Sequence, residues 1–384
     1  MTQAIVHAQQ LIRCRSVTPE EAGALRYLES QLSAAGFRCR RLPFSAPGTP
    51  DVDNLYARLG TGSPHLCFAG HIDVVPPGDE AAWRHPPFAA DIENGVLYGR
   101  GAVDMKGALA AKLSAVLDFL GEMGPAFGGS ISFLITADEE GPAINGTRKA
   151  VEWLAASGER PDACVLGECT SENAAGDTIK IGRRGSLNSV LRLQGLQGHV
   201  AYPEKARNPL PLLIAVLSLL KKEPLDAGSE HFQPSNLEIT SIDTGNPATN
   251  VIPGAATARF NIRFNDLHSG LSLKAWIEAQ ARAALAGSGI DFTLECEFAA
   301  ESFLSSASGF VERLSDAVEA GTGRRPELST GGGTSDARFI KNLCPVAELG
   351  LLNATAHKAN ECVAVSDLEK LSAIYGHFLR LTFA

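Results

Sequence analysis

Histidine and acidic residues follow directly after several stretches of this sequence that are apolar or rich in glycine. The apolar stretches have the composition of buried strands, and the glycine-rich one leads into a predicted helix. Because ligands of open α/β sheets bind beyond the carboxyl ends of the strands, we expect these side chains to gather at one sheet edge. They are His71, Asp73, Asp104, Glu139, Glu140 and Glu168.

Residues of these types can hold metal ions. Zinc binds histidine nitrogen and carboxylate oxygen, and a catalytic zinc site keeps one position open for water. A carboxylate such as Asp104 has two oxygens, so it can bridge two ions. Glu139 and Glu140 are adjacent, so we expect one to bind metal and the other to act as a general base. With His357, late in the chain, the sequence predicts a two-metal site.

Each of these residues also has an ordinary structural interpretation. A single histidine such as His71 is more often a hydrogen-bonded core residue than a ligand. The acidic run Asp138–Glu140 could be a solvated turn, and Asp104 could cap the helix that follows it. The neighbouring Asp73 favours a metal site at His71, and the position of the acidic run directly after a buried strand favours a functional role for it. Asp104 can cap its helix and bind metal at the same time. We expect Cys164 and Cys169, beside another such strand, to be packing residues.

Strands and helices alternate over the first part of the chain, which predicts an α/β fold with a mostly parallel sheet covered on both faces. A capping box at Thr18–Glu21 predicts a helix that runs to Gly36. Further helices are expected from Met105 to about Leu120 and from Gly146 to about Ala156.

The pattern then changes to the order strand, helix, strand, strand, helix, which is typical of a ferredoxin-like α+β domain. We expect this domain to span residues 183–297 as an insertion. The catalytic domain would then consist of residues 1–182 and 298–384.

The composition is that of an ordinary globular protein of 384 residues, and its formal net charge of −9 argues against a nucleic-acid partner. Its eight cysteines are scattered, which is typical of a reducing compartment and not of a disulfide framework. No signal peptide is visible, and no apolar stretch is long enough to span a bilayer. We therefore expect a cytoplasmic protein without a membrane partner.

Ordered motifs over nearly the whole chain resemble the dizinc aminoacylase/carboxypeptidase clan of metallopeptidases and, within it, the succinyl-diaminopimelate desuccinylase family. The motifs shared with the clan are His71–Asp73, Gly99–Gly107, Asp138–Gly141, Gly167-Glu168 and His357. Those that narrow the resemblance to the family are Gly182–Leu187, Gly198–Pro203, Thr249–Pro253, Gly332–Arg338 and Asn353–Glu361. The implied fold is a dizinc-exopeptidase-like catalytic domain with an inserted lid and dimerisation domain.

The resemblance also implies two zinc ions per subunit, with cobalt as a substitute metal. In this sequence His71 and Glu168 would hold one ion. Glu140 and His357 would hold the other, and Asp104 would bridge the two.

Three further residues receive catalytic roles from the resemblance. Asp73 would hydrogen-bond the far nitrogen of His71 and so fix its tautomer. Glu139 would take a proton from the attacking water and pass it to the leaving amine. His199 of the inserted domain would donate to the developing oxyanion, usually across a homodimer. The apolar helix predicted at Pro209–Lys222 would support that dimer.

The implied substrate is a small acyl-amino acid with several carboxylates, N-succinyl-LL-2,6-diaminopimelate, which would be cleaved to succinate and LL-2,6-diaminopimelate. Arginine suits such a substrate because its guanidinium donates two parallel hydrogen bonds to a carboxylate. The residues in the implied substrate-binding motifs are Arg183, Ser186, Tyr202, Asn250, Arg263, Gly333, Thr334 and Asn353.

Three alternatives remain at this point. The chain could be an acetylornithine deacetylase, or another N-acyl-amino-acid deacylase or peptidase. It could also be a non-catalytic metal-binding relative. The sequence departs from the family at Cys169, where the family usually has proline, and this residue puts the fine fit of the substrate in question.

Overall fold

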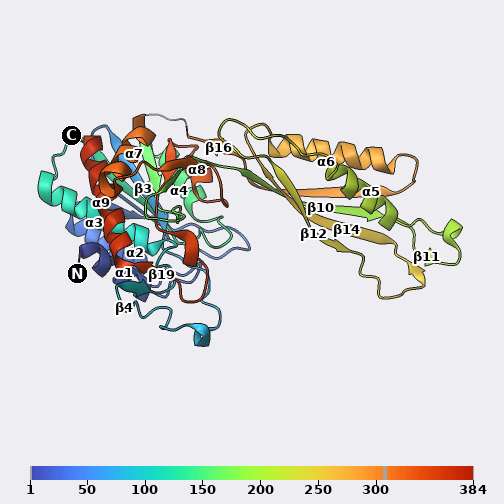
Figure 1. Cartoon of the computed structure of the whole chain (residues 1–384), viewed down its shortest axis with the longest axis horizontal. Coiled ribbons are helices and arrows are strands. Elements are labelled where there is room, and N and C mark those ends of the chain that lie inside the picture. The colour runs from blue at the N-terminus through green and yellow to red at the C-terminus, as the bar shows by residue number, and fades with distance from the viewer. Residues whose placement is uncertain (1, 306–308, 384) are drawn as a thin grey trace. The chain divides into compact units, whose positions relative to one another are not determined.

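The computed structural model describes residues 2–305 and 309–383, and its contacts divide the chain into two compact units (Figure 1). The first unit comprises Met1–Ile181, Ser305–Ser329 and Ser335–Ala384. The second comprises Gly182–Leu304 and Thr330–Thr334. The boundary expected at residue 298 falls inside strand β15 (Asp291–Ala300), which pairs with β10 (Gly185–Gln194) and so belongs wholly to the second unit.

An eight-stranded mixed sheet forms the centre of the first unit. Its central strands β6, β3, β7 and β18 run parallel to one another, and β3, β6 and β7 are buried along their whole length. Burial on both faces explains why these strands are nearly continuous apolar runs in the sequence. The expected α/β fold with a mostly parallel sheet is thus confirmed. The sheet order is β1 (Arg38–Arg41), β2 (Leu55–Gly60), β6 (Ser130–Thr136), β3 (His65–His71), β7 (Ala163–Leu166), β18 (Val346–Glu348), β8 (Thr178–Lys180) and β17 (Glu327–Ser329).

Two groups of helices accompany this sheet. In one group α3 contacts both α1 and α9, and α9 also contacts α7. Phe68 of β3 packs against Tyr375 of α9, and Gly70 lies against Met105 and Leu109 at the start of α3. In the other group α4 contacts α8 and β6, and α2 contacts β1 and β2. The helices are α1 (Gln3–Arg13), α2 (Ala24–Ala34), α3 (Lys106–Met123), α4 (Thr147–Ala156), α7 (Gly309–Thr322), α8 (Ala337–Ile340) and α9 (Val365–Phe383).

The helices expected after Asp104 and Gly146 are present as α3 and α4. The prediction of a capping box at Thr18–Glu21 is wrong. The backbone N–H of Thr18 donates to the carbonyl of Val74 at 3.1 Å, which holds this segment beside the chain that follows β3. Helix α2 begins only at Ala24. The carboxylate of Glu21 caps this start by accepting from the backbone N–H groups of Gly23 and Leu25.

A small three-stranded sheet of the first unit joins two distant parts of the chain. It has the order β19 (Cys362–Ala364), β5 (Val96–Tyr98) and β4 (Ile92–Glu93). Because Cys362 pairs with Tyr98, the segment that contains His357 is brought beside the segment that leads to Asp104.

The second unit has the ferredoxin-like fold that the element order predicted. Its antiparallel sheet has the order β12 (Asn236–Asp243), β14 (Ala255–Phe264), β10 and β15. Helices α5 (Leu210–Leu220) and α6 (Gly270–Leu285) share one core with alternate residues of these strands, and Figure 1 shows both helices on the same side of the sheet. Two short ladders complete the unit: β9 (Gly182–Arg183) with β16 (Phe303–Leu304), and β11 (Gly198–His199) with β13 (Val251–Ile252).

Across residues 2–305 and 309–383, no helix combines the length and the apolar character that crossing a membrane requires.

Candidate metal centre and active site

The first unit brings the predicted metal-binding residues to one edge of its sheet. His71 is the last residue of β3, and Glu168 lies two positions beyond the end of β7. Glu139 and Glu140 follow β6 after a short turn, and Asp104 immediately precedes Met105 and helix α3. Since β6, β3 and β7 are adjacent and parallel, their carboxyl ends open onto the same place.

Asp104 lies between two histidines. Its Oδ1 is 3.3 Å from Nε2 of His71, and its Oδ2 is 3.2 Å from Nε2 of His357. His71 Nε2 is also 3.9 Å from a carboxylate oxygen of Glu168, and His357 Nε2 is 2.8 Å from one of Glu140. Two sets of possible ligands therefore share one carboxylate, and within each set the candidate atoms lie within 4.8 Å of one another.

Two buried atoms at the centre of this cluster support a metal site. Among the residues that the structure describes, no partner in hydrogen-bonding geometry is available to Nε2 of His71 or to Oδ1 of Asp104. Buried polar atoms are rarely left without a partner, so such atoms call for an explanation. Two histidine nitrogens and three carboxylates form a donor set that fits divalent metal ions.

The charges in the cluster perturb one another strongly. Burial lowers the pKa of His71, but the carboxylates of Asp104 and Glu168 outweigh it and hold that pKa well above its ordinary value. The carboxylates of Asp104 and Glu140 raise the pKa of His357 to about 10. Burial would raise the pKa of Asp104, but its two histidine neighbours hold it below its ordinary value. In the absence of metal the two histidines thus carry protons that compensate the carboxylates.

Glu139 lies beside the two ligand sets. Its carboxylate comes within 4.8 Å of ligand atoms of His71 and Glu140. Burial, followed by the nearby charge of Glu168, raises the pKa of Glu139 well above its ordinary value. A carboxyl group with an elevated pKa can both accept and return a proton near neutral pH, as a general base and acid must.

Asp73 contacts His71 through a different atom from the one expected. Nδ1 of His71 donates to the backbone carbonyl of Asp73 at 2.9 Å, whereas the Asp73 carboxylate lies 3.6 Å away. That carboxylate instead accepts from the backbone N–H groups of Glu139 and Glu140, at 3.3 and 3.1 Å. Asp73 therefore fixes the tautomer of His71 with its main chain and orients the Glu139–Glu140 turn with its side chain.

Two residues that support the site were not singled out from the sequence. The carboxylate of Asp138 accepts from three backbone N–H groups, those of Ala143, Ile144 and Asn145, and so closes the loop after Glu140. Glu361 is fully buried and accepts from backbone N–H groups in the loop that carries Asp104. Its place inside the motif Asn353–Glu361 was the only signal available in the sequence.

Of the predicted substrate-binding residues, Asn353 belongs to the first unit and the rest to the second, together with His199. Arg183 of β9 donates to the carbonyl of Gly333 at 3.1 Å, so Gly333 and its neighbour Thr334 lie near it. Ser186 stands opposite Arg263 in the β10–β14 ladder.

His199 belongs to another cluster of the second unit. Tyr202 donates its backbone N–H to the carbonyl of His199, and the two rings are 5.7 Å apart. The carbonyl of Asn250 accepts from the N–H of Val200 at 3.1 Å. The structure therefore gathers His199, Tyr202 and Asn250 at the β11–β13 ladder. This ladder lies beyond the C-terminal end of β10, whereas Ser186 lies near the N-terminal end of that strand.

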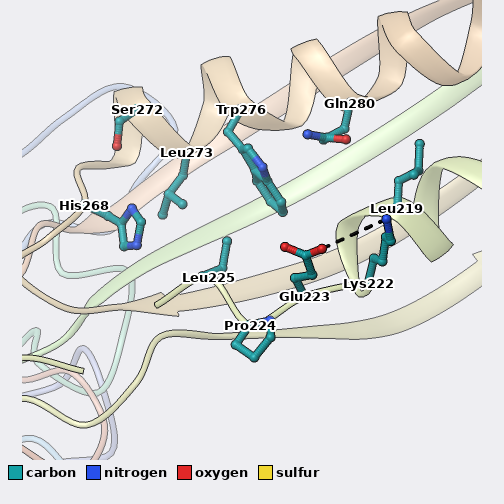
Figure 2. A pocket seen from close by; sticks show the side chains of 10 residues that line it. All are labelled: Leu219, Lys222, Glu223, Pro224, Leu225, His268, Ser272, Leu273, Trp276 and Gln280. Carbon is teal, nitrogen blue, oxygen red and sulfur yellow. Dashed lines mark ion pairs between the residues drawn. The ribbon is translucent and has the colours of Figure 1, made fainter. Parts of the chain in front are cut away.

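A pocket of about 460 Å³ lies in the second unit between the end of α5 and helix α6 (Figure 2). Trp276 and Leu273 line it together with the ion pair Lys222–Glu223, whose charged atoms are 4.0 Å apart. His268 also lines it, but its Nε2 contacts the carboxylate of Asp226 at 3.1 Å. The described residues that line this pocket include none of the predicted site residues.

Comparison with known proteins agrees with this geometry. The model of peptidase family M20/M25/M40 matches residues 67–381. The succinyl-diaminopimelate desuccinylase of Methylorubrum extorquens (strain PA1) is 56% identical over 377 residues, which cover 98% of each chain.

Two solved structures share the fold at low sequence identity. The aminopeptidase PepT of Bacillus cereus has a TM-score of 0.79 at 20% identity and covers 98% of this chain and 97% of its own. A dinuclear metal-binding peptidase of the M20 family from Bacillus subtilis has a TM-score of 0.72 at 16% identity, with the same coverage. Because the family model matches most of its length, the chain belongs to peptidase family M20/M25/M40.

Proposed function

We propose that this chain is a metal-dependent amide hydrolase that releases succinate from N-succinyl-LL-2,6-diaminopimelate. The observation that carries the proposal is the arrangement of two ligand sets around the single carboxylate of Asp104. The high identity to relatives with this activity over nearly the whole chain supports the choice of substrate. The eight cysteines, all among the described residues, are free, which supports a reducing cytoplasmic location.

We expect two zinc ions at these ligands, because zinc binds histidine nitrogen and carboxylate oxygen. His71 and Glu168 would hold one ion, and Glu140 and His357 the other. Asp104 would bridge them through its two oxygens. Cobalt, which takes the same nitrogen and oxygen donors, would substitute for zinc. When bound, the two ions supply Lewis acidity that activates water and polarises the amide carbonyl.

Protein groups would perform the proton transfers. Glu139 takes a proton from the attacking water and returns it to the nitrogen of the leaving amine. Its elevated pKa supports this role, because the group must hold that proton between the two steps. Asp73 keeps Glu139 in place through the turn that its carboxylate organises.

Arginine side chains would recognise the carboxylates of the substrate. Arg183 and Arg263 lie at the same end of strand β10, beside its first residues. Their guanidinium groups can donate paired hydrogen bonds to a carboxylate, which an acetyl group does not offer. The other residues proposed to contact substrate are Ser186, Tyr202, Asn250, Gly333, Thr334 and Asn353.

The second unit itself supports a homodimer in which His199 acts on the partner subunit's substrate. Ser186 is the second residue of strand β10, and His199 lies beyond the other end of that strand. Figure 1 shows the neighbouring strands β16 and β11 at opposite ends of this unit. Ten residues of strand span roughly 30 Å, which exceeds the reach of one small substrate. Two copies could supply both clusters to one site.

The tautomer of His199 suits the role of an oxyanion donor. The backbone N–H of Ala201 donates to Nδ1 of His199 at 3.1 Å, so the proton of the neutral ring resides on Nε2. Nε2–H can then donate to the oxygen of the scissile amide as negative charge develops there.

A parallel assay tests the substrate. Zinc-reconstituted protein is given N-succinyl-LL-2,6-diaminopimelate or N-acetylornithine, and product release is measured before and after chelation. We expect a strong preference for the succinyl substrate, loss of activity with chelator, and recovery with zinc. A preference for acetylornithine would leave the metal centre in place and reject the proposed substrate.

A further inference from the structure

The carboxylate of Glu361 lies under the loop that carries Asp104. It is fully buried and accepts four hydrogen bonds within the first unit. Its Oε1 accepts from the backbone N–H groups of Val103 and Asp104, at 2.9 and 3.2 Å. Its Oε2 accepts from the N–H of Gly101 at 3.0 Å and from the Arg100 guanidinium at 2.8 Å. One side chain thus fixes three backbone amides of this loop.

Arg100 compensates the buried negative charge of Glu361 and adds further contacts to the network. It is itself buried, and its guanidinium stacks over Trp83 with 5.1 Å between the charged carbon and the ring centre. The same Nη1 that donates to Glu361 also approaches the carbonyl of Lys358 at 3.2 Å. The Glu361 carboxylate is paired with Arg100 and hydrogen-bonded through both oxygens, so removal of either partner leaves buried groups of the other unsatisfied.

Glu361 also belongs to the loop that carries His357. The backbone N–H of Gly99 donates to the carbonyl of Glu361 at 2.9 Å, directly before the pairing of β19 with β5. His357 and Asn360 both adopt left-handed backbone conformations, with φ of 60° and 61°. Such conformations are costly for residues other than glycine and persist where surrounding contacts hold them. Glu361 therefore connects the two loops whose ligands meet at the shared carboxylate.

We propose that Glu361 is a positioning residue that sets the affinity of the centre for its second metal ion, the one held by Glu140 and His357. This inference rests on the dinuclear site of the proposed function. Oδ2 of Asp104 and Nε2 of His357 lie 3.2 Å apart, a distance that depends on the relative position of the two loops. Glu361 belongs to the His357 loop and is hydrogen-bonded to the Asp104 loop through both its side chain and its backbone carbonyl. Groups that orient metal ligands typically change metal affinity about ten- to a hundredfold when they are replaced.

The substitution Glu361→Gln tests this. The amide keeps the shape of the side chain but turns one acceptor oxygen into a donor that faces other donors. Apoprotein is titrated with Co²⁺, and both the binding isotherm and the visible absorption of the bound ion are recorded. We expect the affinity for the second ion to fall about ten- to a hundredfold and its absorption to change, with a smaller effect on the first ion.

Asp177→Asn is a matched control. The Asp177 carboxylate also accepts from three backbone N–H groups, those of Glu172, Asn173 and Ala174, in a loop that holds none of the proposed ligands. We expect this variant to lose thermal stability while its Co²⁺ isotherm stays that of the wild type. Glu361→Asp, which keeps the charge but shortens the side chain, provides a second variant if Glu361→Gln does not fold, and the same loss of second-ion affinity is expected.

Wild-type affinity for both ions in the Glu361 variants, even with a lower melting temperature, would overturn the inference and assign Glu361 to fold stability alone. That result differs from failure of the proposed function itself. If the wild-type protein bound fewer than two ions, the proposal of a dinuclear site would be rejected, together with the proposed role of Glu361.

Discussion

Asp104 and His357 come from distant parts of the chain, yet Oδ2 of the aspartate lies 3.2 Å from Nε2 of the histidine. The other oxygen of Asp104 faces His71 at 3.3 Å. One carboxylate between two histidines is an arrangement suited to bridging two metal ions. In the metal-free protein the same arrangement makes both histidines hold protons.

Metal binding should therefore release protons. A histidine must be neutral to bind metal, and the pKa values of His71 and His357 are both raised, the latter to about 10. At pH 7.5 we expect about two protons to leave when the site fills, one from each ring. Calorimetric titration with zinc in buffers of different ionisation enthalpy measures this number.

The sign of the pH dependence follows from the same shifts. Protons compete with metal wherever the histidines of the metal-free protein are protonated, so metal affinity should rise as the pH increases from 6 towards the pKa of His357 at about 10. His357→Gln removes one of the two protons and should reduce the slope. An affinity independent of pH, with no dependence of the enthalpy on the buffer, would contradict the assignment of these ligands.

Glu139→Gln should abolish turnover without removing metal. The amide matches the carboxylate in size but cannot accept the proton of the attacking water. Loss of a general base typically lowers kcat by a factor of about 10²–10⁴. Metal content by elemental analysis should stay at the wild-type value. Near-normal turnover would show that another group moves the proton.

Mixing two inactive variants tests whether His199 acts across a dimer. Glu139→Gln inactivates a subunit's own site, and His199→Ala inactivates the site of its partner. In a mixed dimer one site carries both defects and the other carries none. Random reassortment of equal amounts should restore about a quarter of the wild-type activity.

The homogeneous variants, treated in the same way, are the controls for that experiment. Mass spectrometry verifies that the subunits have exchanged. If the activity of the mixture then equals the sum of the activities of the two homogeneous variants, His199 acts in the site of its own subunit or outside catalysis.

Part of the site could be predicted because His71, Glu140 and Glu168 lie at or just beyond the ends of buried parallel strands. His71 ends β3 and Glu168 follows β7, and strands of this kind are visible as apolar runs. The ferredoxin-like fold of the second unit could be predicted for a similar reason, since the order of its elements appears in the hydrophobic periodicity.

Tertiary contacts determined what could not be predicted. The sequence does not distinguish the carbonyl of Asp73 from its carboxylate, and the carbonyl is the group that bonds His71. Thr18 has the local signature of a helix cap, but a hydrogen bond to Val74 holds it in another conformation. The contact of Glu361 with the Asp104 loop depends on the pairing of two distant strands, which no local pattern records.

The central claim is that two metal ions share Asp104, and anomalous diffraction from crystals of the zinc-loaded protein tests it most directly. Data collected on either side of the zinc absorption edge should give two peaks. One should lie between His71 and Glu168, and the other between His357 and Glu140, with Asp104 in contact with both. A single peak, or two peaks away from Asp104, would contradict the dinuclear site.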